Sequence, residues 1–205
     1  MKKILLLVSC FVCTAVLLGD DMVINVKGRK AVLHDNFTWE YLDMQDAPDS
    51  EGPLALSFDA SIINPFVSKN GKYKIYIDTE KWRTTSGLND DADFQFVNSD
   101  QTGFGLLLFD GLPIPLDSMK DILIVNANNI DPNARILDVR PCTVNGSEGE
   151  IVTYTARASG LEFIFHTFIT TNENGTIQFT FYTLSSVFGK LKPLFEEAIA
   201  GLVFE

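Results

Sequence analysis

Histidine and cysteine are scarce in this chain, and their scarcity excludes several kinds of site. The two histidines, His34 and His166, lie far apart in the sequence, so a zinc site is not expected. Of the three cysteines, Cys10 and Cys13 fall within an N-terminal apolar segment, which leaves Cys142 without a partner for an internal disulfide. Cys142 lies in a strand-like stretch, which favours a buried structural thiol over a reactive one.

The motifs of common enzyme classes are also missing. There is no glycine-flanked nucleophilic serine and no glycine-rich phosphate-binding loop. A hydrolase needs a nucleophile with a base in reach. His166 shares a predicted strand face with Ile164 and Phe168, which favours a histidine packed against the core over a catalytic base. We therefore expect a protein that is not an enzyme.

Basic residues are few relative to acidic ones. The chain has 16 Lys and Arg against 27 Asp and Glu, a net charge of −11. Lys2 and Lys3 precede Asp20, the first acidic residue, so a chain that begins near Asp20 loses two positive charges and reaches −13. Such a surface repels nucleic acid and anionic lipid headgroups, so no nucleic-acid partner is expected. The excess is explained by solubility, and the alternative is a cationic partner or bound metal ions.

Hydrophobic runs of membrane-spanning length are absent. The longest apolar stretch, Ile4 to Leu18, follows Lys2 and Lys3 and has the length of a signal peptide, which we place at residues 1–19. The protein is therefore expected to be exported, either to the periplasm or as a secreted protein. Alternatively, Leu7-Val8-Ser9-Cys10 resembles the lipobox of bacterial lipoproteins, which would place a lipid on Cys10 and attach the N-terminus to the membrane.

Residues 20–42 predict a small β unit, a short hairpin or meander. Val23 to Val26 alternates in polarity, and Phe37, Trp39 and Tyr41 fall on one face of the last strand. The stretch resembles a short motif found near the start of many exported bacterial proteins. We expect these three aromatic side chains to bind the main domain or a partner protein, because so small a unit is marginally stable alone. Residues 43–60 are acidic and rich in proline, which predicts a linker.

Residues 61–205 predict one α+β domain. Leu161 to Ile169 is apolar on both faces, which is typical of a central strand covered on both sides, and Thr176 to Tyr182 returns beside it. Apolar spacing predicts helices over residues 116–130 and from Ser185 or Ser186 to Gly201. The element order is three strands, a helix, four strands and a helix, which indicates an antiparallel β-sheet flanked by helices.

Four segments carry a resemblance to a known fold. They are Tyr73 to Asp78 with Trp82, the helix entry Pro115-Leu116-Asp117, the turn Asn145-Gly146, and Leu191 to Glu197. Their order resembles the PsbP-like fold, an α/β/α sandwich shared by an extrinsic subunit of the photosynthetic oxygen-evolving complex, a nuclear Ran-binding protein and many small exported bacterial proteins. The resemblance implies a binding or assembly protein rather than an enzyme.

One local cluster suggests a metal. Asp90, Asp91 and Asp93 supply the hard oxygen ligands that calcium prefers, although an acidic turn exposed to water is the favoured interpretation. The sequence thus predicts a non-catalytic exported protein that binds or assembles an envelope protein partner and needs no cofactor. The alternative is a module that binds a small ligand or Ca²⁺.

Overall fold

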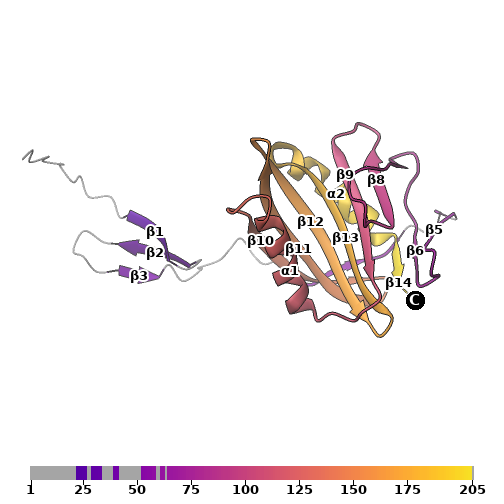
Figure 1. Ribbon diagram of the computed structural model, residues 1–205, viewed down its shortest axis with the longest axis horizontal. Helices are drawn as coiled ribbons and strands as arrows, with labels where there is room; N and C mark the ends of the chain where they lie inside the picture. Colours follow the sequence, from indigo (N-terminus) through magenta and orange to yellow (C-terminus); the bar gives the residue numbers. More distant parts are fainter. Residues whose placement is uncertain are drawn as a thin grey trace, which may run out of the picture. The chain divides into compact units, whose positions relative to one another are not determined.

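The computed structural model describes residues 22–26, 29–33, 39–41, 52–58, 61–62 and 64–204, which fall into two compact units, residues 1–49 and 50–205 (Figure 1). In the first unit, β1 (Met22–Val26), β2 (Arg29–Leu33) and β3 (Trp39–Tyr41) form an antiparallel sheet in that order. These strands agree with the predicted β unit. Phe37 lies outside the described residues, and so do the side chains of Trp39 and Tyr41.

The second unit is built on one sheet of eight strands. Its order is β4-β10-β11-β12-β13-β9-β8-β7, and every pairing is antiparallel except that of β4 with β10. The strands are β4 (Leu54–Leu56), β7 (Trp82–Thr84), β8 (Phe94–Asn98), β9 (Gly103–Asp110), β10 (Arg135–Val144), β11 (Ser147–Ala158), β12 (Leu161–Asn172) and β13 (Gly175–Leu184). The strand predicted to be central, β12, lies inside the sheet with four strands on one side and three on the other.

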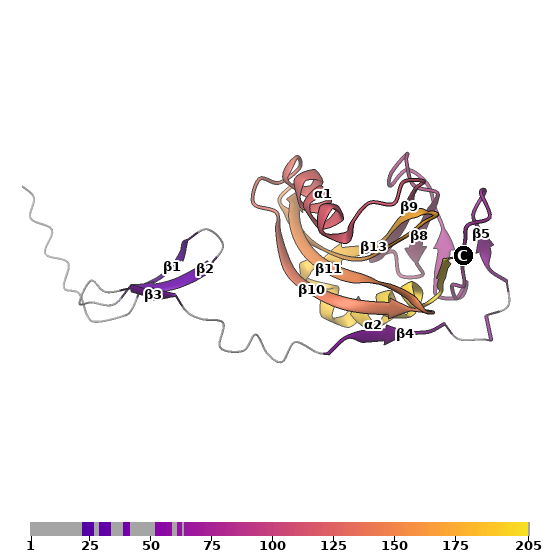
Figure 2. The ribbon, with the colours of Figure 1, turned by 90° about the horizontal axis from the view of Figure 1, so that it is seen from below.

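Helix α1 (Leu116–Asn128) covers one face of the sheet over β11 and β12 (Figure 2). It buries Met119, Leu123 and Ala127 against a cluster that includes Tyr154 and Ile169. Lys120 joins the helix to β11 through an ion pair with Glu150, with 3.0 Å between Nζ and Oε2. Both carboxyl partners of Lys120, Asp117 and Glu150, raise the pKa of its ammonium group.

Helix α2 (Phe188–Ala200) covers the opposite face and follows a 3₁₀ turn, η1 (Ser185–Val187) (Figure 2). Its buried stripe holds Leu191, Phe195, Ala198 and Ile199, the spacing that places apolar side chains on one side of a helix. Phe195 packs on Phe181 of the sheet, with 5.5 Å between ring centroids. A third sheet, β14 (Leu202–Phe204), β6 (Tyr73–Ile75) and β5 (Phe66–Val67), adds Tyr73 and Ile75 to this core. Across the described residues, no helix is long and apolar enough to span a membrane.

The main unit starts earlier than the sequence analysis placed it. Residues 43–60 were predicted to be a linker, yet Leu54–Leu56 form β4 and pair with Cys142–Val144. A three-residue strand has no periodicity of its own, and its hydrogen bonds go to a strand that is remote in sequence, so the pattern could not reveal it. Trp82 is buried, and it begins strand β7 after a single hydrogen-bonded turn from Asp78.

Gly201, at the end of α2, lies against the backbone of Tyr76, the residue that follows β6. Tyr76 donates its N–H to the carbonyl of Gly201, with 2.8 Å between N and O. A β-carbon placed on Gly201 would stand 1.8 Å from the Tyr76 carbonyl oxygen, which is far inside van der Waals contact. Glycine is therefore required here by close approach, and this contact sets where the residues after β6 lie relative to α2.

We expect Gly201→Ala to lower the free energy of unfolding by about 1–3 kcal/mol, because the β-carbon must push the two backbones apart. The matched control is Gly189→Ala in the same helix, where a β-carbon meets nothing within 4 Å. That change should stabilise by about 0.5–1 kcal/mol, because alanine is the better helix former. Urea unfolding of the two variants measures both effects, and equal stability of the two proteins would contradict the close-approach argument.

Candidate functional site

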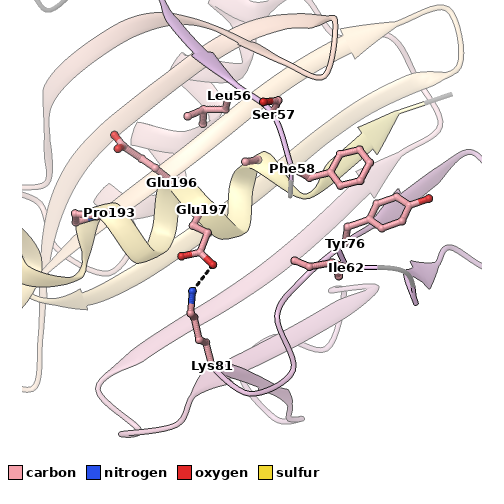
Figure 3. Close-up of a pocket in the computed structure, with 10 residues that line it drawn as sticks. Leu56, Ser57, Phe58, Ile62, Tyr76, Lys81, Pro193, Glu196 and Glu197 are labelled. Carbon is pink, nitrogen blue, oxygen red and sulfur yellow. Dashed lines mark hydrogen bonds and ion pairs between the residues drawn. The ribbon is translucent and has the colours of Figure 1, made fainter. Parts of the chain in front are cut away.

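A groove of about 570 Å³ runs along the exposed side of α2 (Figure 3). The helix contributes Pro193, Glu196, Glu197 and Ala200, whose spacing places them beside the buried stripe. The facing walls come from the end of β4 and the chain that follows it, with Leu56, Ser57 and Phe58, from Ile62, and from Tyr76 and Lys81 after β6. The volume lies within the range of binding pockets for small molecules and short peptide segments.

One end of the groove is aromatic. The rings of Phe58 and Tyr76 stack with 4.4 Å between centroids and an interplanar angle of 14°. These two residues come from segments on either side of β5, so the stack fastens the chain after β4 to the chain after β6. Together with Leu56 and Ile62 they give this end an apolar lining.

The other end of the groove is charged. Lys81 forms an ion pair with Glu197, with 2.5 Å between Nζ and Oε1, and stands 3.6 Å from a carboxylate oxygen of Asp78. The hydrogen bond to Glu197 is the main cause that raises the pKa of Lys81. Figure 3 shows Glu196 and Glu197 leaving α2 in different directions, with Glu197 turned toward Lys81. Glu196 faces Lys192 and His166 instead, with contacts of 3.7 and 3.8 Å.

The Asn145 side chain holds together two walls of the groove, the end of α2 and the segment after β4. Asn145 sits at the turn between β10 and β11 with φ of 48°, a left-handed conformation that asparagine tolerates, and Gly146 follows with φ of 86°. Its Nδ2 donates to the carbonyls of Ala200 and Leu202, each at 2.7 Å. Its Oδ1 accepts the N–H of Phe58 at 3.2 Å. One side chain therefore ties the end of α2 to the segment after β4.

His166 lies under α2 and is buried, with its side chain only 3% exposed. Its Nδ1 is 2.9 Å from the hydroxyl of Thr153. Its Nε2 makes no hydrogen bond within the described residues and points toward Glu196, 3.8 Å away. Burial, followed by the charges of Lys192 and Arg140, lowers the pKa of His166 to about 3. The imidazole is therefore neutral at physiological pH and does not neutralise Glu196.

The sequence matches no protein-family model and no curated protein. The structure is similar to the solution structure of cyanobacterial PsbP (CyanoP) from Synechocystis sp. PCC 6803. That likeness has a TM-score of 0.53 at 12% identity and covers 69% of this chain and 92% of that chain. The fold is PsbP-like.

Two further solved structures are similar to this chain with lower TM-scores. LpqN of Mycobacterium tuberculosis, described as involved in cell envelope biogenesis, has a TM-score of 0.48 at 10% identity and covers 68% of this chain and 88% of that chain. A protein from Bacteroides thetaiotaomicron has a TM-score of 0.46 at 18% identity and covers 70% of this chain and 49% of that chain. The likeness to CyanoP, at 12% identity, shows the fold alone, and with it the predicted PsbP-like α+β architecture is confirmed.

The acidic turn of Asp90, Asp91 and Asp93 lies at the surface of the domain. Asp93 accepts a hydrogen bond of 2.5 Å from the hydroxyl of Tyr73. Gln95 accepts the N–H groups of Leu88 and Asn89 and donates to the Asn89 carbonyl, so an amide side chain holds the turn. Asp90 and Asp91 are exposed. Within the described residues, no three His, Cys, Asp or Glu side chains group as metal ligands, so the calcium alternative gains no support.

Of the other residues singled out in the sequence, some are buried in the structure and some lie outside the described residues. Cys142 is 3% exposed and free, as expected for a structural thiol, and burial raises its pKa to about 11. His166 packs on the core side of β12, also as predicted. Cys10 lies outside the described residues, so the lipidation prediction has no structural outcome, and the same holds for the aromatic trio of the first unit.

The groove could not be predicted from the sequence, because its walls come from segments separated by more than a hundred residues. Two features of the sequence belong to the groove, but neither identifies it. The Asn-Gly turn at Asn145 was recognised as a turn, but its amide bonds to Ala200 and Leu202 depend on the tertiary structure. The acidic pair Glu196 and Glu197 lies off the apolar stripe of α2, which marks a polar helix face and nothing more specific.

We expect Asn145→Asp to destabilise the domain by about 2–3 kcal/mol. The carboxylate can still accept from Phe58, but it loses both donated hydrogen bonds and stands beside two carbonyl oxygens. Asn64→Asp, an exposed asparagine in a loop, is the control and should change stability by less than about 0.5 kcal/mol. Urea unfolding measures both, and a neutral Asn145→Asp would show that the clamp is unimportant.

His166 should make the domain less stable in mild acid. The pKa of His166 is about 3 in the folded protein and near 6.5 in the unfolded chain. Below pH 6.5 the unfolded chain therefore binds a proton at this residue, whereas the native state does not. Between pH 7.5 and 5.5 this group alone should remove about 1.4 kcal/mol of stability, and the loss should continue toward pH 3. The drop should be smaller by that amount in His166→Asn, which does not titrate in this range.

An NMR titration of the His166 ring provides the direct check of this assignment. Its carbon-bound proton shifts should stay constant from pH 8 to pH 5, while the domain remains folded. A midpoint near pH 6.5 would contradict the burial argument.

Proposed function

We propose that this protein is a non-catalytic, exported binding module that holds a segment of an envelope protein partner in the groove along α2. The groove is the single observation that supports this function best. It is open to solvent, and it combines an apolar aromatic end with a charged end. Its walls are fastened to one another by the Asn145 hydrogen bonds and the Lys81–Glu197 ion pair. A preformed groove of this kind lowers the entropy cost of binding.

The protonation states of Cys142 and His166 do not suit catalysis. A nucleophilic cysteine needs a lowered pKa, whereas Cys142 is buried with a raised one. A general base works best with a pKa near the working pH, whereas His166 is held neutral far below its usual value and buried. These two states support a binding role over a catalytic one.

Export of the protein is proposed from the N-terminal sequence. Lys2 and Lys3 followed by the apolar stretch to Leu18 are the features of a signal peptide, and a partner in the cell envelope follows from that destination. The aromatic trio of the first unit stays a predicted second contact with the partner. Its contribution can be measured separately from that of the groove, because the two lie in different units of the chain.

We expect crosslinking in intact cells, followed by affinity capture of the full-length tagged protein, to recover one reproducible envelope protein. Ser57→Trp should abolish that capture, because the exposed Ser57 lines the groove and an indole there fills it. Ser118→Trp, the same substitution at an exposed site on α1, should leave capture unchanged. Thermal melting of both variants must show that they fold.

Three results of this experiment are decisive. Equal capture by the two tryptophan variants would exclude the groove as the contact. Loss of capture only on replacing Phe37, Trp39 and Tyr41 with alanine would move the contact to the first unit. Absence of any envelope partner would overturn the proposal as a whole.

A further inference from the structure

Three asparagine residues of this chain, Asn70, Asn145 and Asn174, are followed directly by glycine. Such pairs are the most reactive toward deamidation, because glycine has no β-carbon to hinder attack of its backbone nitrogen on the asparagine amide. The three pairs therefore have similar chemistry in an unfolded chain. What differs among them is how the folded domain restrains the two atoms that must meet, Cγ of the asparagine and N of the glycine.

The reaction converts an amide into an acid, with water as the only reactant. The glycine nitrogen loses its proton to solvent base and forms a bond to Cγ of the asparagine, while the bond from Cγ to Nδ2 breaks and ammonia leaves. Water then opens the resulting cyclic imide at either of its two carbonyl carbons. The product is aspartate or isoaspartate, and in isoaspartate the main chain runs through the side-chain methylene group.

At Asn145 the fold restrains the amide rather than the attacking nitrogen. Gly146 is exposed and belongs to no strand, so its nitrogen is accessible. The Asn145 side chain is tied at both Oδ1 and Nδ2, by three hydrogen bonds to backbone groups at least 55 residues away in the sequence. Rotating Cγ toward the Gly146 nitrogen breaks these bonds. Deamidation therefore requires the end of α2 and the segment after β4 to separate from this turn.

At Asn174 the fold restrains the attacking nitrogen instead. Gly175 begins β13, pairs with Asn172 of β12 and is buried. A β-carbon placed on Gly175 would stand 2.2 Å from the Asp110 carbonyl oxygen, so this backbone is packed tightly inside the sheet. Reaction at Asn174 therefore requires the hairpin of β12 and β13 to open.

The restraints on Asn70 come from its own turn, between β5 and β6. Asn70 is exposed, and its Oδ1 accepts hydrogen bonds from the Ser68 hydroxyl at 2.8 Å and the Lys72 N–H at 3.0 Å. The Gly71 N–H donates to the Ser68 carbonyl at 3.0 Å. A single exposed turn opens more readily than contacts between remote segments. Asn70 is thus the reference site, and an aspartate there keeps the accepting oxygen.

We propose that Asn145 is a guarded deamidation site, whose reaction with Gly146 is prevented while its side chain is clamped and is irreversible once it occurs. The product cannot rebuild the clamp. Aspartate has no amide hydrogens to donate to Ala200 and Leu202, and isoaspartate lengthens the main chain of a turn with φ angles of 48° and 86°. The clamp therefore limits the lifetime of the domain as well as its stability, whatever the groove binds.

Mass spectrometry of each Asn-Gly peptide tests the guarding. The full-length protein is incubated at mildly alkaline pH, either folded or in guanidinium chloride above its unfolding transition. We expect Asn70, Asn145 and Asn174 to react at similar rates when unfolded. Folding should slow Asn145 about a hundredfold, as expected for three net hydrogen bonds, and Asn70 by less than about tenfold. Equal slowing of Asn70 and Asn145, or no slowing of Asn145, would overturn the proposal.

Two glycine variants separate opening of the clamp from unfolding of the whole domain. Gly201→Ala pushes the end of α2 away from Tyr76 beside the clamp, so it should speed the reaction of Asn145 in the folded protein at least about fivefold. It should speed Asn174 much less. Gly189→Ala, where a β-carbon meets nothing within 4 Å, should speed neither. Equal acceleration of Asn145 and Asn174 by Gly201→Ala would show that the clamp is not the guard.

The irreversibility is tested on protein that has already reacted. After incubation in guanidinium chloride the chain is refolded and exposed briefly to protease, at a urea concentration just below the unfolding midpoint of the unmodified protein. Molecules converted at Asn145 should be digested, and molecules converted only at Asn70 should survive. The same fraction of converted Asn145 before and after digestion would contradict the claim that this reaction prevents closure of the clamp.

Discussion

The burial of β12 on both faces is the constraint on which the rest of the domain depends. Its side chains alternate between a face under α1, where Ile169 packs, and a face under α2, where Phe168 packs. A strand with apolar groups on both sides is stable only if each side is covered, so the sheet must extend around it and a helix must lie on either face. The order of the eight strands satisfies the first requirement, and α1 and α2 satisfy the second (Figures 1 and 2).

The groove is a consequence of how α2 is held on that sheet. Phe195 and Ile199 press one side of the helix into the core, which leaves Glu196, Glu197 and Ala200 on the side where the groove opens. The end of the helix is then fixed at two points, by the close approach of Gly201 to Tyr76 and by the amide of Asn145. Both contacts involve backbone carbonyls, so they set the position of the walls more strictly than side-chain packing alone would.

The ionisable groups of the domain fall into two sets, those that are buried and neutral and those that are ionised and lie beside the groove. Burial disfavours charge at His166 and Cys142, so both remain neutral in the core near neutral pH. Burial also raises the pKa of Tyr73 above its usual value, so this hydroxyl is neutral too, and the hydrogen bond to Asp93 adds to the effect. The ionised groups Lys81, Glu196 and Glu197 lie on the open side of α2, where water screens them and a partner can reach them.

The elements determined by the sequence alone are those with a long repeating pattern. The hairpin of β12 and β13, the buried stripe of α2, the central place of β12 and the core position of His166 all follow from alternation or helical spacing within one segment. The short strands β4, β7 and β14 were missed because three residues carry no period, and β4 and β14 also gain their hydrogen bonds from strands that are remote in sequence. The groove was decided only by the tertiary structure. Asn145 predicts a turn in sequence, and only folding brings its amide to Ala200, Leu202 and Phe58.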